Sequence, residues 1–199
     1  MLKIAFAGGL IAGSVAAHAT WYTSEASFVA AIDPTYYLED FSNFSPGSPL
    51  NGSQPTWAAP GANGYGWTAS AVGNLYSLTH AIIPFGAGQT LTITFTGNPV
   101  TAFGGYVGGI VPPGNFVADT ETMTLSNGES QSITTTSSGD GFLGWVGSAP
   151  ITSLDLNVSN SSTWIQLRHA YTGSAPVPEP ASLAVLGLGA IVLIRRKRK

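Results

Sequence analysis

Threonine alternates with apolar side chains through residues 90–96, where Leu91, Ile93 and Phe95 occupy every second position. A period of two places one side of a strand in a core and the other side in water. Shorter stretches with strand character recur at 36–41, 66–71, 101–107, 121–125, 130–136, 142–146, 151–158 and 163–171. These short, evenly spaced segments predict an all-β domain, an antiparallel β-sandwich of jelly-roll type rather than a barrel.

Helix and turn signals add detail to this prediction. Ser24 and Glu25, followed by apolar side chains at Phe28 and Ile32, predict one short N-terminal helix with Ser24 as its N-cap. Asn127-Gly128 separates two alternating segments and predicts a hairpin with a type I′ turn. Residues 45–64 contain four prolines and four glycines and show no strand pattern, so we expect a surface loop there.

The N-terminus has the order of a secretory signal peptide. Lys3 precedes an apolar stretch over residues 4–17, and Ala17-His18-Ala19 has small residues at the two positions that signal peptidase reads. A membrane anchor is the alternative, but about fourteen apolar residues are fewer than the roughly 20 needed to span a bilayer. We therefore predict a signal peptide over residues 1–19, removed by signal peptidase after Ala19.

The C-terminus has three parts in a fixed order. Pro178, Glu179 and Pro180 come first, an apolar segment follows over 181–194, and residues 195–199 are all basic. The basic residues would hold their end in the cytoplasm by the positive-inside rule. A helix over the apolar segment reaches only about 21 Å against a hydrocarbon core of about 30 Å. This predicts a marginal transmembrane helix, better suited to a temporary stop than to a permanent anchor.

This order of tripeptide, apolar helix and basic cluster resembles the PEP-CTERM sorting signal, with residues 178–199 as the matching segment. The resemblance implies export in a Gram-negative exopolysaccharide producer, through an inner-membrane intermediate, to the cell surface or extracellular matrix. It also implies that an exosortase recognises Pro178, Glu179 and Pro180 and that the tail is removed. A plain single-pass anchor is the alternative. The expected organisation is a signal peptide at 1–19, a sandwich domain at 20–172, a linker at 173–177 and the sorting signal at 178–199.

Charge is distributed unevenly along the chain. Between Thr20 and Ala175 nine carboxylates face one cation, Arg168, which gives this body a net charge of −8. Such a body repels a phosphate backbone, which excludes nucleic acid as a partner. The chain contains no cysteine, so disulfides, thiolate metal sites and a cysteine nucleophile are excluded as well.

Catalytic patterns are weak. The body holds two histidines, His80 and His169, without metal-ligand spacing, and it lacks a Gly-x-Ser-x-Gly motif. Glu39 and Asp40 adjoin in an expected strand, so their side chains point to opposite faces and cannot form a hydrolase pair without a bulge. We therefore expect a non-catalytic structural or glycan-binding protein. A secreted carbohydrate-active hydrolase is the alternative function.

Two kinds of binding site are consistent with the composition. A body of charge −8 attracts a hard cation, and a structural calcium is the cofactor that the sequence leaves open. Its candidate ligands, which could equally be solvated edge charges, are Glu39, Asp40, Asp119 and Glu121. Exopolysaccharide is the other expected ligand, because flat aromatic rings stack on sugars. The candidate rings are Trp57, Tyr65, Trp67 and Tyr106, whereas Trp145 and Trp164 lie in strand patterns typical of a core.

Overall fold

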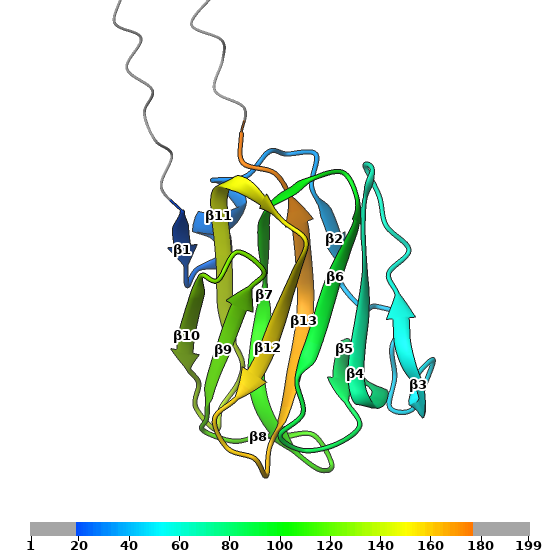
Figure 1. Ribbon diagram of the computed structural model, residues 1–199. Coiled ribbons are helices and arrows are strands. Elements are labelled where there is room, and N and C mark those ends of the chain that lie inside the picture. Colours follow the sequence, from blue (N-terminus) through cyan, green and yellow to red (C-terminus); the bar gives the residue numbers. More distant parts are fainter. Residues whose placement is uncertain (1–18, 177–199) are drawn as a thin grey trace, which may run out of the picture.

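The computed structural model describes residues 19–176, so the expected signal peptide and sorting tail lie outside the described residues. The described chain is almost entirely β-structure with antiparallel pairing, and its sheet folds over on itself into two layers (Figure 1). The predicted all-β antiparallel sandwich is therefore confirmed. Among these residues no helix is long and apolar enough to cross a membrane.

The layers use strands from distant parts of the chain. The first layer contains β1 (Thr20–Tyr22), β11 (Gly141–Ile151), β7 (Val100–Val111), β13 (Trp164–Gly173) and β5 (Ala81–Pro84), with β2 (Tyr37–Glu39) beside β13 and β8 (Asn115–Phe116) beside β7. The second layer contains β10 (Ser130–Thr134), β9 (Thr120–Leu125), β12 (Ser153–Val158), β6 (Leu91–Gly97), β4 (Tyr65–Leu78) and β3 (Asn51–Ala58).

Strand β4 joins the two layers. Its first half pairs with β6 and its second half pairs with β5. At the corner between the halves Val72 is 98% exposed and Asn74 has a φ of 71°. A strand that passes from one sheet to the other needs such an irregularity, because regular pairing would keep it in one sheet.

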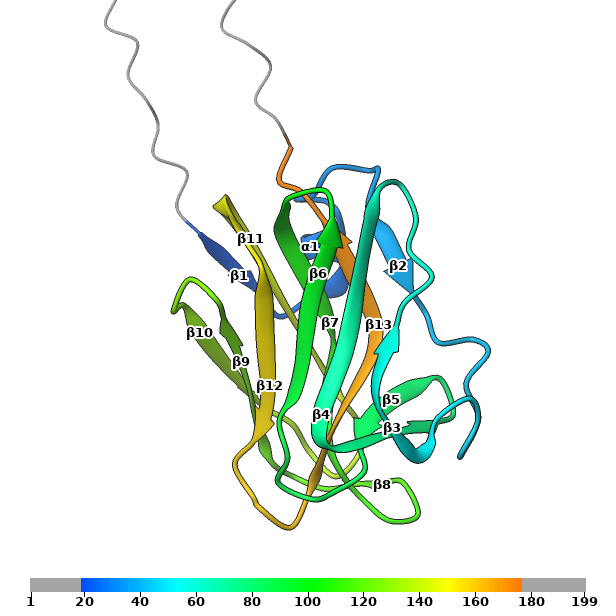
Figure 2. The same cartoon turned by 45° about the vertical axis from the view of Figure 1, so that its right-hand side comes forward.

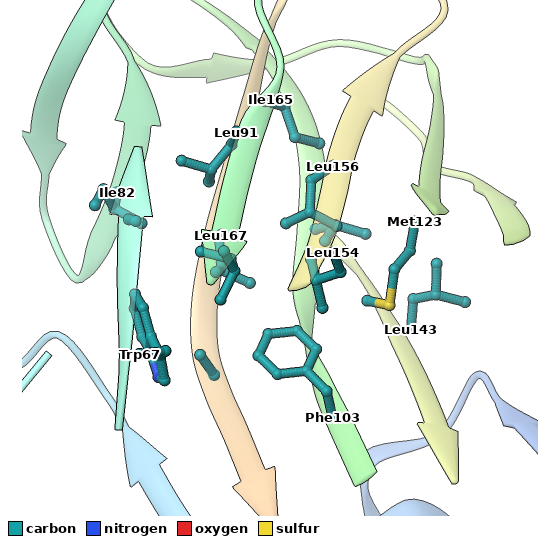
Figure 3. Close-up of a cluster of buried hydrophobic side chains, with 14 of the residues drawn as sticks. Trp67, Ile82, Leu91, Phe103, Met123, Leu143, Leu154, Leu156, Ile165 and Leu167 are labelled. Atoms are coloured by element: carbon teal, nitrogen blue, oxygen red, sulfur yellow. The ribbon is translucent and has the colours of Figure 1, made fainter. Parts of the chain in front are cut away.

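The core lies between the layers (Figure 3). Leu91 and Ile93 of β6 are fully buried there, as the alternation in residues 90–96 predicts. Phe103 and Leu167 come from the opposite layer and are also fully buried. Side chains of this size stabilise a fold by roughly 1.5–3 kcal/mol each when they leave water.

The short helix is confirmed as α1 (Glu25–Val29), and the side chain of Ser24 caps it by accepting a hydrogen bond from the Ser27 amide. It packs on the first layer (Figure 2). Its Phe28 side chain is fully buried in a second, smaller cluster with Phe142 and Tyr171. The helix therefore forms a small core of its own outside the main one.

Two local predictions are wrong. Residues 45–64 are not a loop throughout, because β3 occupies Asn51–Ala58 and pairs with β4. Pro55 is tolerated there since β3 has a partner on one side only. In the β9–β10 hairpin only Gly128 of the Asn127-Gly128 pair has a positive φ, of 89°. The Leu125 amide bonds to the Glu129 carbonyl, which makes a three-residue loop with a glycine bulge instead of a type I′ turn.

The end of β13 is tied to the body. The Asp33 amide donates to the carbonyl of Ser174 over 2.9 Å. The Ala175 amide donates to Thr101 Oγ1 over 2.8 Å. The segment expected as a linker at 173–177 thus begins with residues that are hydrogen-bonded to the sandwich.

Candidate functional site

An apolar groove of about 500 Å³ opens beside the first residue of β13. Two strands of the β4–β5 hairpin form one wall, and β7, β13 and the loop after β7 form the other. The lining residues are Pro46, Tyr76, Leu78, Ile83, Phe85, Ile110, Pro112, Pro113, Gly114 and Trp164. In Figure 1, β8 and the first residues of β13 lie at the bottom of the sandwich, away from the end of β13.

Strand register places these side chains on the outer face of the sheet. Tyr76 lies opposite Ile83 across β4 and β5, and Trp164 lies opposite Ile110 across β13 and β7. The next residue of β13, Ile165, is fully buried in the core. Because successive side chains of a strand point to opposite faces, Trp164 points away from the core and into the groove.

The groove presents aromatic rings to the solvent. Phe85 is 54% exposed, and its ring centroid lies 5.9 Å from that of Tyr76. Trp164 is half-buried. The side-chain polar atoms of the lining set are Tyr76 Oη and Trp164 Nε1. Rigid aromatic faces with a few polar atoms are the usual lining of a small-ligand or sugar site.

None of the four aromatic residues proposed from sequence lines this groove. Tyr65 and Trp67 are 8% and 1% exposed, so neither presents a free face to a sugar. Trp57 is half-buried and packs edge-on against Phe44 and Trp67, with ring centroids 5.0 and 5.4 Å away. Trp67 lies in the segment 66–71 that was expected as a strand, and this segment belongs to β4, where Gly66 fits against Thr96 Oγ1. These rings close one end of the core.

Tyr106, the fourth of these residues, belongs to a polar cluster around Glu25. The Tyr106 hydroxyl donates to Glu25 Oε2 over 2.9 Å, and the Tyr171 hydroxyl donates to Glu25 Oε1. Burial, with added hydrogen bonds to Glu25, raises the pKa of both tyrosines. His169 Nδ1 lies 3.9 Å from Glu25 Oε1, at a bulge of β13 where the φ of His169 is 48°. This cluster anchors α1 to the sheet.

Arg168 is the one Arg or Lys residue in the described chain. Its Nη1 lies 3.0 Å from Asp140 Oδ2, so its charge is paired. Gln166 Nε2 donates to the same oxygen over 3.4 Å. Asp140 therefore ties the loop between β10 and β11 to β13, and the cation is not left free for an anionic ligand.

Glu39 and Asp40 use their carboxylates locally. Glu39 Oε1 accepts a hydrogen bond from the Phe41 amide and Oε2 accepts one from the Tyr37 hydroxyl. Asp40 is exposed, and hydrogen bonds from Ser42 lower its pKa. His80, the other residue weighed for catalysis, lies in the turn between β4 and β5 with a φ of 55°. Glu39, Asp40 and His80 therefore occupy turns and strand ends, where their side chains serve local structure.

Asp119, the residue before β9, is hydrogen-bonded to the loop between β12 and β13. Its Oδ1 accepts hydrogen bonds from the Thr120 amide, Ser159 Oγ and the Asn160 amide, and its Oδ2 accepts one from Thr163 Oγ1. Burial alone would raise the pKa of Asp119, but these hydrogen bonds outweigh it and hold the pKa below its ordinary value. The side chain stays ionised and fully engaged.

Glu121, two residues further along the chain, is buried, and its pKa is raised where that of Asp119 is lowered. Its side chain is 0% exposed, and its Oε1 accepts a hydrogen bond from Thr135 Oγ1 over 2.9 Å. Its Oε2 is buried without a hydrogen-bond partner. Burial raises the pKa of the Glu121 carboxyl above its ordinary value near 4.5. This carboxylate is costly to keep ionised in the fold.

The carboxylates expected to share a calcium do not come together. Glu39 lies opposite Ala170 near the end of β13. Asp119 instead accepts a hydrogen bond from Thr163, which lies beside the first residue of β13. Across residues 19–176 no group of three or more acidic or histidine side chains is placed to hold a metal ion. Calcium also requires six to eight oxygens, more than the four carboxylate oxygens that either pair offers.

Comparison with known proteins adds the class of the protein. A family model described as the PEP-CTERM protein-sorting motif matches residues 176–199. The chain is therefore an exported protein with a β-sandwich body. More particularly, it carries a PEP-CTERM sorting motif, the signal for processing by an exosortase, as Pro178, Glu179 and Pro180 predict.

One solved structure is similar over most of its own length. It is the CBM22-1 xylan-binding domain from Paenibacillus barcinonensis Xyn10C, with 15% sequence identity and a TM-score of 0.29, covering 70% of this chain and 95% of that chain. No curated protein matches the chain.

Proposed function

We propose that this exported protein works at the cell surface or in the extracellular matrix as a non-catalytic glycan-binding component. Its partners on the way there are signal peptidase, an exosortase and the inner membrane, which holds the apolar tail before processing. The ligand is a polysaccharide of the producing organism, bound in the groove beside β13. The PEP-CTERM motif supports the route, and the groove supports the binding.

The observation that carries the proposal is the set of aromatic rings on one groove. Tyr76 of β4, Phe85 directly after β5 and Trp164 of β13 line the same depression. A pyranose ring has an apolar face of C–H groups, and aromatic side chains bind it with little loss of conformational entropy because they are rigid. One such contact is weak, but several along one groove give useful affinity.

The position of the groove suits a protein held at its C-terminus. Trp164 begins β13, and Gly173 ends it before the sorting segment. A strand of this length spans about 30 Å. The groove and the start of the tail thus lie at opposite ends of β13 (Figure 1), so the groove lies away from the membrane-held end before the tail is removed.

The lining favours binding over hydrolysis. Glycoside hydrolysis uses a pair of carboxyl groups on either side of the scissile bond. The side chains that line the groove include no Asp or Glu. A hydrolase remains the alternative function, and release of sugar distinguishes it from a binding protein.

Retention on polysaccharide tests the proposal. The purified full-length protein, solubilised in detergent, is incubated with exopolysaccharide of the producing organism, and the supernatant is assayed for both protein and reducing sugar. We expect retention without sugar release, lost in Trp164→Ala and in Phe85→Ala. Leu38→Ala is the matched control, since Leu38 is an exposed apolar residue opposite Tyr171 near the other end of β13. Sugar release, or equal retention of all variants, would overturn the proposal.

A further inference from the structure

We infer that the groove selects a neutral glycan whose hydroxyls are partly replaced by methyl, deoxy or O-acetyl groups. This inference rests on the proposed function and names the ligand class of the same groove. Three features of the groove and its surroundings lead to it: the charge of the body, the scarcity of hydrogen-bond donors in the lining, and the exposed apolar side chains.

Charge excludes anionic polymers. The body carries a net charge of −8, and none of the lining residues is charged. Thr163, next to Trp164, donates to Asp119, whose lowered pKa keeps that carboxylate ionised at neutral pH. Arg168, the one arginine among residues 19–176, is paired with Asp140. A uronate or phosphate group near the groove would meet repulsion and find no free cation.

The groove also provides few hydrogen-bond donors. Its side-chain polar atoms are Tyr76 Oη and Trp164 Nε1. Three lining residues, Pro46, Pro112 and Pro113, have no backbone N–H to offer. A sugar hydroxyl buried without a partner loses its bonds to water and gains nothing in return. An unmodified hexopyranose with all hydroxyls free is therefore poorly matched to these walls.

Apolar substituents on the sugar would instead gain affinity by packing on the same apolar walls. Phe85 is 54% exposed, and Pro112 and Pro113 of the loop after β7 are exposed lining residues as well. Each methyl or methylene group that leaves water against such surfaces improves affinity by about fourfold. An O-acetyl group adds a methyl and removes a hydroxyl donor, so its combined effect is about tenfold.

The test uses one polymer in two chemical states. Binding of the detergent-solubilised full-length protein is measured by affinity electrophoresis on O-acetylated glucomannan and on the same glucomannan after alkaline deacetylation, with polygalacturonate as the anionic polymer. We expect the acetylated polymer to bind about tenfold more tightly than the deacetylated one. Polygalacturonate should retard the protein and its groove variants equally, because the basic residues 195–199 can bind it in all of them. Trp164→Ala and Phe85→Ala should remove the preference, and Leu38→Ala should keep it.

Several results would overturn the inference. Equal or tighter binding of the deacetylated polymer refutes the preference for substituents, and salt-sensitive binding of polygalacturonate that Trp164→Ala or Phe85→Ala weakens refutes the preference for neutral chains. No retardation by the acetylated polymer also refutes it. In each case the proposed function stands if exopolysaccharide retention still depends on Trp164 and Phe85. A loss of binding in Phe85→Ala is not explained by misfolding, because the Phe85 side chain is about half exposed and its removal leaves the core intact.

Discussion

Gly144 of β11 lies directly opposite Gly104 of β7, and the Phe28 ring of α1 packs on this pair of glycines. A Cβ on Gly144 would come within 2.6 Å of Phe28 Cδ2, and one on Gly104 within 3.1 Å of Phe28 Cε1. Both distances are shorter than normal carbon contacts. The helix can dock at this depth only because neither strand has a side chain there.

Gly144→Ala should therefore destabilise the protein by about 2 kcal/mol, since the methyl overpacks the small core around Phe28. Urea unfolding followed by fluorescence measures the change. In the background of Phe28→Ala the cost of Gly144→Ala should shrink, because the clashing ring is gone. Additive effects in this double-mutant cycle would show that Phe28 is not what Gly144 accommodates.

Glu121→Gln should stabilise the protein at neutral pH by about 1 kcal/mol or more, because the variant buries an amide in place of a charge. The pKa of Glu121 is raised in the fold. Its contribution is thus most favourable below the unfolded pKa near 4.5 and is lost as pH rises through the folded pKa. Urea unfolding between mild acid and neutral pH should show the advantage of the variant growing with pH. A constant difference would contradict this account.

Asp119→Asn should have the opposite sign. The pKa of Asp119 is lowered in the fold, so its contribution is present above the unfolded pKa near 3.8 and is lost as pH falls through the folded pKa. The amide also offers donors where Ser159 and Thr163 already donate. We expect a loss of about 2–3 kcal/mol at neutral pH. The loss should diminish in acid, and a pH-independent loss would refute the role of the charge.

Calcium should leave the melting temperature unchanged. The four carboxylates named from the sequence form two separate pairs, each bonded to its own neighbours. Thermal unfolding in millimolar calcium and in excess chelator should therefore coincide. A rise of several degrees with calcium would require a site that these carboxylates do not form in the described structure.

Regular alternation made most of the strands predictable, and its absence explains the rest. β6 and β9 show a clean period of two and lie where expected. β3 was missed because an edge strand with one neighbour tolerates Pro55 and Gly52, which look like loop residues in sequence. β5 has all its residues buried and is too short for a period to appear.

The site was harder to foresee than the fold. Trp67 was expected to stack on a sugar and Trp164 to lie in the core, whereas Trp67 is buried and Trp164 is half-buried and lines the groove. Periodicity distinguishes the two faces of a strand but does not say which face meets the core. The groove joins residues from Pro46 to Trp164, so no local pattern describes it. The tail was predictable because its three parts are contiguous.

The direction of β13 has a mechanical consequence. A ligand held at Trp164 and a tether beyond Gly173 would pull on the two ends of one strand. That strand is bonded along its length to β7, with partners from Ile110 to Ala102. Such a force stretches the covalent backbone of one strand, so it neither shears these hydrogen bonds nor opens them. Before the tail is removed, the sandwich can therefore carry tension between the membrane and a polymer through a single strand.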